Sequence, residues 1–290
     1  MEVNIQKYQA FITAVETGSF TETAQRLNYS QSGISHMIAD LESGWNVTLL
    51  ERGHAGIKLT SDGTKILPAV KKLCLEFENL QRSVQELQGL KTGLIRIGTF
   101  SSVATHWLPK IIKQFQKDYP GINYEILMGD YAEIEQWIEE GRVDCGFLPL
   151  PVSKDLEAIS LYKDELMAVI PKNHPFAKSE SFPVEELCKS PFMLLEKGEK
   201  SGVAAVFEKN HLTPDVRFTT WDDYAIMSMV ENGLGISIVP ELILRRAPYD
   251  IVTLPLSVRA YRDIGFVLRN RESAGLAVLT FMKYLDYRNM

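Results

Sequence analysis

The stretch that most constrains this chain is residues 19–42, SFTETAQRLNYSQSGISHMIADLE. Ser19 stands three residues before Glu22, which is the capping-box spacing of a helix N-terminus, and Ser30 is a good N-cap for a second helix. Apolar residues recur at helical spacing on both sides of Asn28 and Tyr29: Phe20, Ala24 and Leu27, and then Ile34, Met37, Ile38 and Leu41. The stretch therefore predicts two short helices joined by a tight turn, a helix-turn-helix.

The second of these helices has a small, polar outer face. Ser32, Ser35, His36 and Ala39 share one helical spacing opposite the apolar stripe. Short side chains near its N-terminus would let this helix approach base edges in a DNA major groove. The core of any helical hairpin shows the same pattern, so an ordinary solvated helix face is the competing interpretation.

The surrounding residues make the pattern more specific. Many positions at fixed spacing resemble the N-terminal domain of LysR-type transcriptional regulators: Phe11, Gly18, Ser19, Phe20, Ala24, Leu27, Ser30, Gln31, Ser35, Leu41, Glu42, Leu49, Glu51, Arg52, Leu59 and Thr60. The resemblance implies a winged helix-turn-helix that binds double-stranded DNA. Strands expected at residues 47–52 and 57–60 would form the hairpin of the wing.

The expected DNA contacts lie in the helix-turn-helix of residues 20–39 and in the wing. Ser32, Ser35 and His36 are expected to contact base edges. Gln31, Arg52 and Lys58 are expected to contact the phosphate backbone. Residues 1–60 hold four basic and six acidic side chains, and the whole chain has a net charge of −6. DNA binding would therefore rely on locally placed donors and two copies of the domain, not on a broad basic field.

A long helix is predicted from Ser61 onward. Its apolar residues alternate by three and four positions, a coiled-coil spacing, and we expect a homodimer to form through Val70, Leu73, Phe77, Leu80, Val84 and Leu87. Packing against the chain's own domains is the alternative. Pro68 predicts a kink or a late helix start, because proline lacks a backbone donor. The family resemblance further implies homotetramers, with the C-terminal domains supplying the second contact.

Strands and helices alternate after a polar hinge at residues 89–93. Strands at residues 94–98, 123–128 and 143–148, with helices at 102–119 and 131–140, predict a parallel sheet with helices on both faces. A second unit is expected to have helices near residues 183–188, 201–210 and 223–232, and strands near 192–195, 216–218 and 235–239. The chain would then return through a strand at 261–268 and close with a helix at 273–287.

This half resembles the family's effector-binding domain, an α/β fold of two Rossmann-like subdomains like that of type 2 periplasmic binding proteins. The expected domains are a winged helix-turn-helix at residues 1–60, a linker helix and hinge at 61–92, and an effector-binding domain at 93–290. Within the last, subdomain I would comprise residues 93–161 and 266–290, and subdomain II residues 162–265.

A small-molecule effector would bind between the two subdomains, where the carboxyl ends of the strands leave space. The polar or turn-forming residues at those strand ends and helix starts are Thr99, Ser101, Ser102, Pro149, Glu196, Ser201, Thr220 and Asp222. Free backbone donors where Ser101 and Ser102 begin a helix favour an anionic oxygen. Helix capping by the serines and surface exposure of Asp222 are the alternatives. Acidic groups beside hydroxyls would suit a small metabolite with a carboxylate and a donor.

Two other classes of protein compete with this interpretation. A solute-binding protein shares the two-lobed fold, but the start MEVNIQKYQAF is not typical of a signal peptide, and no apolar run is long enough for a membrane span. An enzyme is disfavoured because neither a GxSxG nor a phosphate-binding glycine loop is found. The three cysteines and five histidines show no metal-ligand spacing. We therefore expect a cytoplasmic transcriptional regulator with no cofactor other than its effector, and with RNA polymerase as a further candidate partner.

Overall fold

The computed structural model describes residues 4–53, 56–86, 92–195 and 202–289. The chain divides into two compact units, Met1–Val84 and Gln85–Met290, and each is described by itself. The expectations for Leu87, Glu196 and Ser201 lie outside the described residues, as does the side chain of Arg52.

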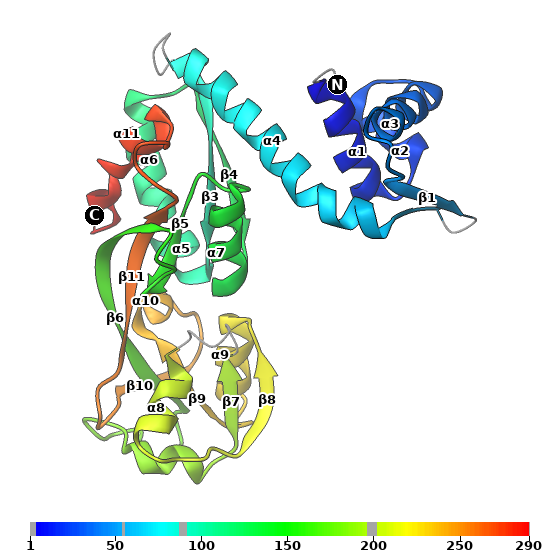
Figure 1. Cartoon of the computed structure of the whole chain (residues 1–290). Helices are drawn as coiled ribbons and strands as arrows, with labels where there is room; N and C mark the ends of the chain where they lie inside the picture. Colours follow the sequence, from blue (N-terminus) through cyan, green and yellow to red (C-terminus); the bar gives the residue numbers. More distant parts are fainter. Residues whose placement is uncertain (1–3, 54–55, 87–91, 196–201, 290) are drawn as a thin grey trace. The chain divides into compact units, whose positions relative to one another are not determined.

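The first unit consists of helices and one hairpin (Figure 1): α1 (Ile5–Thr17), α2 (Phe20–Leu27), α3 (Gln31–Trp45), β1 (Leu50–Gly53), β2 (Gly56–Leu59) and α4 (Ser61–Glu86). Ser19 caps α2 by accepting from the Glu22 N–H at 3.4 Å, and Ser30 caps α3 by accepting from the Gly33 N–H at 3.0 Å. Asn28 ends α2 with a left-handed φ of 56°, a conformation that asparagine tolerates. The helix-turn-helix is thus formed by local capping chemistry.

One feature of the capping differs from the prediction. The Ser19–Glu22 spacing predicts that the Glu22 carboxylate reaches back to the start of its helix. Instead, Glu22 accepts a hydrogen bond from Arg26 at 2.9 Å, one turn further along α2. The Ser19 N–H, from which a capping-box carboxylate would accept, donates to the Thr17 Oγ1 at 3.2 Å instead.

α4 begins at Ser61 and includes Pro68, so a late helix start is wrong. Thr60 caps it, because the Gly63 N–H donates to the Thr60 Oγ1 at 2.8 Å. The first turns of α4 belong to the core of the first unit, where Val70 and Cys74 are buried with residues of α1, α2 and α3.

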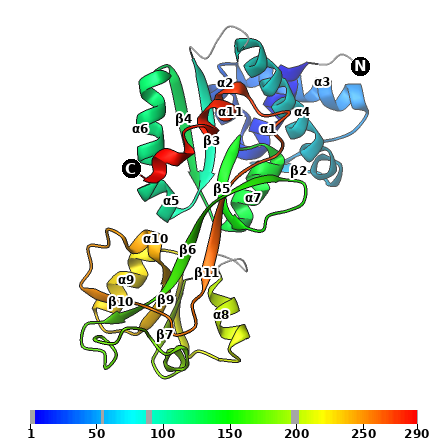
Figure 2. The same cartoon turned by 90° about the vertical axis from the view of Figure 1, so that its left-hand side faces the viewer.

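The second unit contains one mixed sheet with the strand order β4-β3-β5-β11-β6-β9-β7-β8, and β10 pairs with β6. Its strands are β3 (Gly93–Thr99), β4 (Ile122–Met128), β5 (Cys145–Leu150), β6 (Glu157–Pro171), β7 (Phe192–Leu195), β8 (Val216–Thr220), β9 (Ile236–Pro240), β10 (Ile251–Pro255) and β11 (Tyr261–Leu268). Among these nine strands, β3 pairs in parallel with β4 and β5, and β7 pairs in parallel with β8 and β9. The second unit has two lobes: the first contains β3, β4 and β5, and the second contains β7, β8 and β9. The long strands β6 and β11 are antiparallel, and they run from one lobe to the other (Figure 2).

Helices of this unit are α5 (Ser101–His106), α6 (Leu108–Asp118), α7 (Tyr131–Glu140), α8 (Val203–Lys209), α9 (Asp223–Glu231), α10 (Glu241–Leu244) and α11 (Leu276–Met282), with 3₁₀ turns η1 (Val184–Cys188) and η3 (Leu285–Asn289). The single helix predicted at residues 102–119 is two helices that meet at Trp107. Pro109, in the first turn of α6, has no N–H with which to continue α5. The helix predicted at 273–287 is likewise divided, and β10 and α10 were not predicted.

Each lobe has its own apolar core. Phe100, Phe115, Phe147 and Phe281 are fully buried in the first lobe. Two smaller clusters fill the second lobe, one on each side of β6: one includes Leu166 and Ala168, and the other Val169. The two lobes therefore fold around separate cores, and the polar side chains described below lie where they meet.

Candidate functional site

The outer face of α3 is polar and accessible. Gln31, Ser32 and His36 are exposed and Ser35 is half-buried, whereas Ile34 and Ile38 are fully buried on the opposite face. The Ser32 hydroxyl lies 3.0 Å from that of the capping residue Ser30. The structure therefore places the candidate base contacts on one accessible face of the second helix. Lys58 is exposed on β2, opposite Glu51 of β1.

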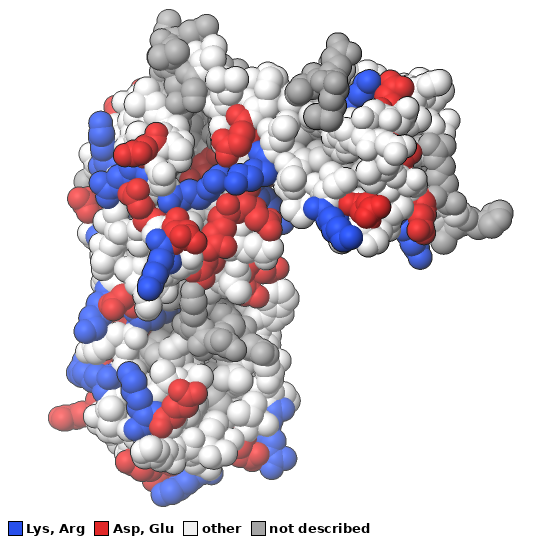
Figure 3. Space-filling model, viewed as in Figure 1, with Lys and Arg blue, Asp and Glu red and all other residues white. Residues whose placement is uncertain are grey.

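Some charged side chains of the first unit are paired with one another. Lys7 of α1 contacts Asp40 of α3 at 3.0 Å, and Arg26 is engaged by Glu22. On the face of the first unit that Figure 3 shows, basic side chains are few and acidic ones lie close by. The first pair neutralises a carboxylate on α3 that would otherwise repel a phosphate backbone.

The apolar stripe of α4 is exposed along its C-terminal part. Leu73, Leu80 and Val84 are 42%, 59% and 50% exposed, and Phe77 is half-buried. Val70 differs, because the core of its own unit leaves it only 6% exposed. From Leu73 onward, the helix presents apolar surface that the first unit does not cover.

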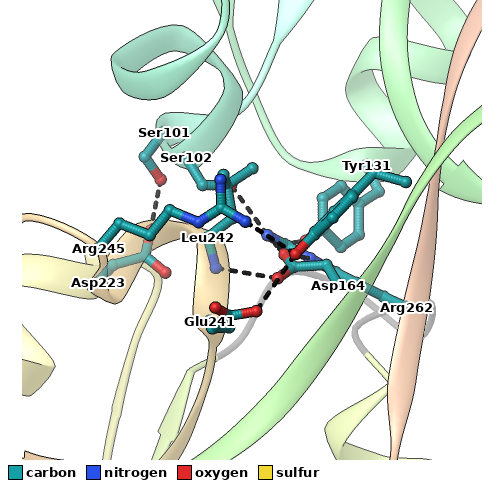
Figure 4. Close-up of polar contacts among 10 residues, drawn as sticks. Ser101, Ser102, Tyr131, Asp164, Asp223, Glu241, Leu242, Arg245 and Arg262 are labelled. Atoms are coloured by element: carbon teal, nitrogen blue, oxygen red, sulfur yellow. Dashed lines mark hydrogen bonds and ion pairs between the residues drawn. The ribbon is translucent and has the colours of Figure 1, made fainter. Parts of the chain in front are cut away.

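A buried arginine organises the polar residues between the two lobes of the second unit (Figure 4). Arg262 of β11 donates through Nε and Nη2 to the Asp164 Oδ2 of β6, at 2.9 Å and 2.7 Å. It also donates to the Tyr131 hydroxyl at 2.7 Å and to the Ser102 hydroxyl at 2.8 Å. Its guanidinium lies 4.9 Å from the ring centre of Phe100. One side chain thus joins the two long strands to α5 and α7.

This cluster is also tied to α10. The remaining Asp164 oxygen, Oδ1, accepts from the Leu242 N–H at 2.9 Å. Burial alone would lower the pKa of Arg262, but Tyr131 and the carboxylates of Asp164 and Asp223 outweigh it, and the pKa is raised. Burial raises the pKa of the Tyr131 hydroxyl. The guanidinium is therefore held charged, and the phenol neutral.

A second contact crosses directly from lobe to lobe. The Ser101 hydroxyl, at the start of α5, donates to the Asp223 carboxylate, at the start of α9 (Figure 4). Asp223 is only 2% exposed. Nearby, the Tyr162 hydroxyl of β6 donates to Glu241 at 3.2 Å and accepts from Arg245 at 2.8 Å.

The other effector candidates lie elsewhere or have local roles. Thr99 is fully buried at the end of β3, and Pro149 is buried in β5. The Thr220 Oγ1 accepts from the Asp222 N–H at 3.3 Å. Asp222 is exposed and caps α9 by accepting from the Tyr224 N–H at 2.9 Å. Of the described candidates, Ser101 and Ser102 are thus the two that join the polar contacts between the lobes.

Tyr131, Asp164, Asp223 and Arg262 are not among the site residues expected from the sequence. Asp164 stands between the charged residues Lys163 and Glu165, and Arg262 is followed by Asp263. Nothing in this local pattern distinguishes Asp164 and Arg262 from exposed charged residues, so their burial and their pairing were not predictable from it.

His106, at the end of α5, is buried close to α10, and its Nε2 has no hydrogen-bond partner among the described residues. Burial lowers the pKa of His106, and the cations Arg245, Arg246 and Lys110 lower it further. The imidazole is therefore neutral near pH 7. A group of three or more possible metal ligands is not found in the described part of the chain, and no described helix is long and apolar enough to cross a membrane.

Comparison with known proteins gives two matches to family models. Residues 5–64 match the model "bacterial regulatory helix-turn-helix protein, lysR family", and residues 88–288 match "LysR substrate binding domain". Among curated relatives, the chain is 31% identical over 286 residues to the probable HTH-type transcriptional regulator LrrA of Synechococcus elongatus, covering 98% of this chain and 96% of that protein. It is 29% identical over 284 residues to the uncharacterized HTH-type transcriptional regulator YvbU of Bacillus subtilis, covering 97% of each.

Two solved structures share the fold over nearly the whole chain. A full-length cysteine-to-aspartate variant of OxyR from Pseudomonas aeruginosa has a TM-score of 0.76 at 19% identity, covering 100% of this chain and 96% of that one. Full-length CbnR, solved in complex with its target DNA, has a TM-score of 0.73 at 19% identity, covering 99% of this chain and 100% of that one.

Proposed function

The chain belongs to the LysR family of helix-turn-helix transcriptional regulators, and on that premise we propose which residues perform its functions. It is a DNA-binding transcriptional regulator with an effector-binding domain. We assign DNA recognition to α3 and the β1–β2 hairpin, self-association to α4, and effector binding to the polar residues between the two lobes. We expect the protein to bind DNA in the cytoplasm. No step of the proposed function requires catalysis or a cofactor besides the effector.

DNA recognition rests on the exposed face of α3. Ser32, Ser35 and His36 stand on the N-terminal half of the second helix of the helix-turn-helix, the part that such proteins place against base edges. Gln31 at the start of α3 and Lys58 on β2 are exposed and would contact phosphates, as would Arg52. Because so few cations are available, log affinity should fall only shallowly with log salt for a dimeric DNA-binding protein.

Self-association is assigned first to the apolar stripe of α4. A stripe of Leu73, Phe77, Leu80 and Val84 at coiled-coil spacing fits a second copy of the same helix. Two such helices would hold two DNA-binding units at half-sites about one helical turn of DNA apart, or a multiple of it.

A second contact, between effector-binding units, would complete a tetramer. The strands at the two ends of the sheet order bear exposed apolar side chains: Ile126 and Met128 on β4, and Val216 and Phe218 on β8. Edge strands of this kind are suited to pairing with another chain.

Effector binding is assigned to the region where α5 and α9 meet. Ser101 and Asp223 bring a hydroxyl and a carboxylate from different lobes into contact. Ser102 lies beside them and is linked through Arg262 to both long strands. A ligand that binds Ser101 would therefore act on groups connected to the strands between the lobes. We propose a small polar metabolite as the effector.

The test of DNA recognition is Ser35→Glu, with Gln6→Glu on α1 as a control that adds the same charge to an exposed site of the same unit. A carboxylate at position 35 would lie against phosphates and acceptor-rich base edges, so specific binding should be lost. A nuclease footprint on the DNA flanking its own coding region would measure this. Should Ser35→Glu give the footprint of the parent protein, α3 is not the recognition helix.

A further inference from the structure

The Ser101–Asp223 contact joins parts of the second unit that are far apart in sequence. The partners are 122 residues apart, on α5 of the first lobe and α9 of the second. Each lobe has its own core, so this contact is not required for either lobe to fold. Its direct effect is to hold the start of α5 against the start of α9.

The Asp223 carboxylate is unusually placed for an acidic side chain. It is 2% exposed, and burial of a carboxylate is costly unless hydrogen bonds or a nearby cation stabilise its charge. The Ser101 hydroxyl supplies a hydrogen bond, and Asp223 lies within electrostatic range of the Arg262 guanidinium. The fold therefore holds a carboxylate beside Ser101.

The sequence predicts an anionic oxygen at Ser101 and Ser102, and it predicts that an effector supplies this oxygen. In the structure, the oxygen beside Ser101 belongs to the chain itself. A second carboxylate at the same hydroxyl would lie next to the first, and two like charges at that separation strongly disfavour each other. A carboxylate ligand could bind Ser101 only after Asp223 had moved away.

We propose that Asp223 is an internal ligand, whose carboxylate occupies the position on Ser101 that a carboxylate effector takes. The proposal rests on the assignment of effector binding to this region. Binding of such an effector and contact between α5 and α9 are then mutually exclusive. The effector separates the two helices by taking the place of Asp223, and the contact keeps the effector-free lobes together.

Chemical rescue tests this directly in the full-length protein. Asp223→Ala removes the internal carboxylate and leaves the Ser101 hydroxyl in place. Sodium acetate should then raise the thermal unfolding temperature of the variant saturably, relative to sodium chloride at equal ionic strength. The parent should show no such difference, because its position is filled. The double variant with Ser101→Ala should lose the rescue.

A matched control is Asp215→Ala, which removes an exposed carboxylate of the same lobe, one paired with Arg217 at 2.8 Å. It should show no acetate effect. The proposal is overturned if acetate stabilises the parent and Asp223→Ala equally, or stabilises neither, or if the rescue persists without the Ser101 hydroxyl.

If Asp223→Ala does not fold, Asp223→Asn serves in its place, because an amide of the same shape keeps the volume but loses the charge. Amide hydrogen exchange at residues 100–106 should then be faster than in the parent, and unchanged exchange would overturn the proposal. Either failure leaves the DNA-binding assignment standing, because the footprint tests that assignment on a separate unit.

Discussion

Replacing Arg262 with methionine should lower the free energy of unfolding of the effector-binding unit by about 3–5 kcal/mol, the usual cost of removing one partner from a buried ion pair. Methionine fills much of the same space, so the loss of charge and hydrogen bonds dominates the effect. Four hydrogen bonds disappear, to Asp164, Tyr131 and Ser102. Asp164 is fully buried and, within the described part of the chain, would retain only the Leu242 N–H as a donor.

The size of the loss follows from burial, and a nearby exposed ion pair offers a control for it. The side chains of Arg262 and Asp164 are 2% and 0% exposed, so water cannot replace the lost partner. Arg259 pairs with Glu165 at 2.9 Å, but the Arg259 side chain is 59% exposed. Arg259→Met should therefore cost at most about 1 kcal/mol.

Unfolding in urea should be monitored through the hydrogen exchange of amides in β6 and β11, because these amides report on the effector-binding unit alone. A thermodynamic cycle with Asp164→Leu completes the test. The double variant removes both charges, so its loss should be smaller than the sum of the single losses by more than about 1 kcal/mol. If the losses add, or if Arg262→Met costs no more than Arg259→Met, the two side chains are not the energetically coupled pair described above.

The remaining predictions concern assembly and pH. Leu80→Glu should place a charge in the proposed interface between two α4 helices and reduce the mass measured by light scattering. Gln81→Glu, a control at the neighbouring exposed position, should leave the mass unchanged. Equal masses for the two variants would exclude Leu80 from the interface. The pKa of His106 is lowered in the folded protein, so the unfolded chain binds the proton more readily. The free energy of unfolding should therefore fall as the pH drops below about 6.5, with His106 contributing at most about 1.4 kcal/mol per pH unit. His106→Gln should make the stability between pH 7 and 5 less dependent on pH than in the parent, and the slope that remains includes His174, whose pKa burial also lowers. An unchanged slope would show that His106 titrates normally in the folded state.

The parts of the fold that local chemistry determines were predictable from the sequence. α7 was predicted with its observed bounds, because Asp130 and Glu133 form a complete capping box and Gly141 ends the helix with a left-handed φ of 73°. The helix-turn-helix was predictable for the same reason: its capping serines form hydrogen bonds to residues three positions away, and Asn28 ends α2 at its own position. The region predicted as one helix at residues 102–119 is divided in two near Pro109, because proline lacks the N–H that would continue the first helix.

The contacts between the lobes were beyond local reasoning. Arg262 and Asp164 are 98 residues apart, and they meet because β6 and β11 pair in antiparallel register. A shift of one residue in that register would turn one of the two side chains to the other face of the sheet. The sequence predicts an effector contact at Asp222, whereas the structure gives Asp222 the capping role and gives the neighbouring Asp223 the contact across the lobes.

The burial of Val70 and Cys74 has a practical consequence for anyone who cuts this chain into pieces. The helix-turn-helix family match ends at residue 64, yet both side chains lie beyond that point and pack among the residues of α1, α2 and α3. A fragment that stopped at the end of the match would expose the apolar surface that these side chains cover, and would be prone to aggregate. An expression fragment of the DNA-binding unit therefore has to extend past Cys74, into the helix that looks like a linker.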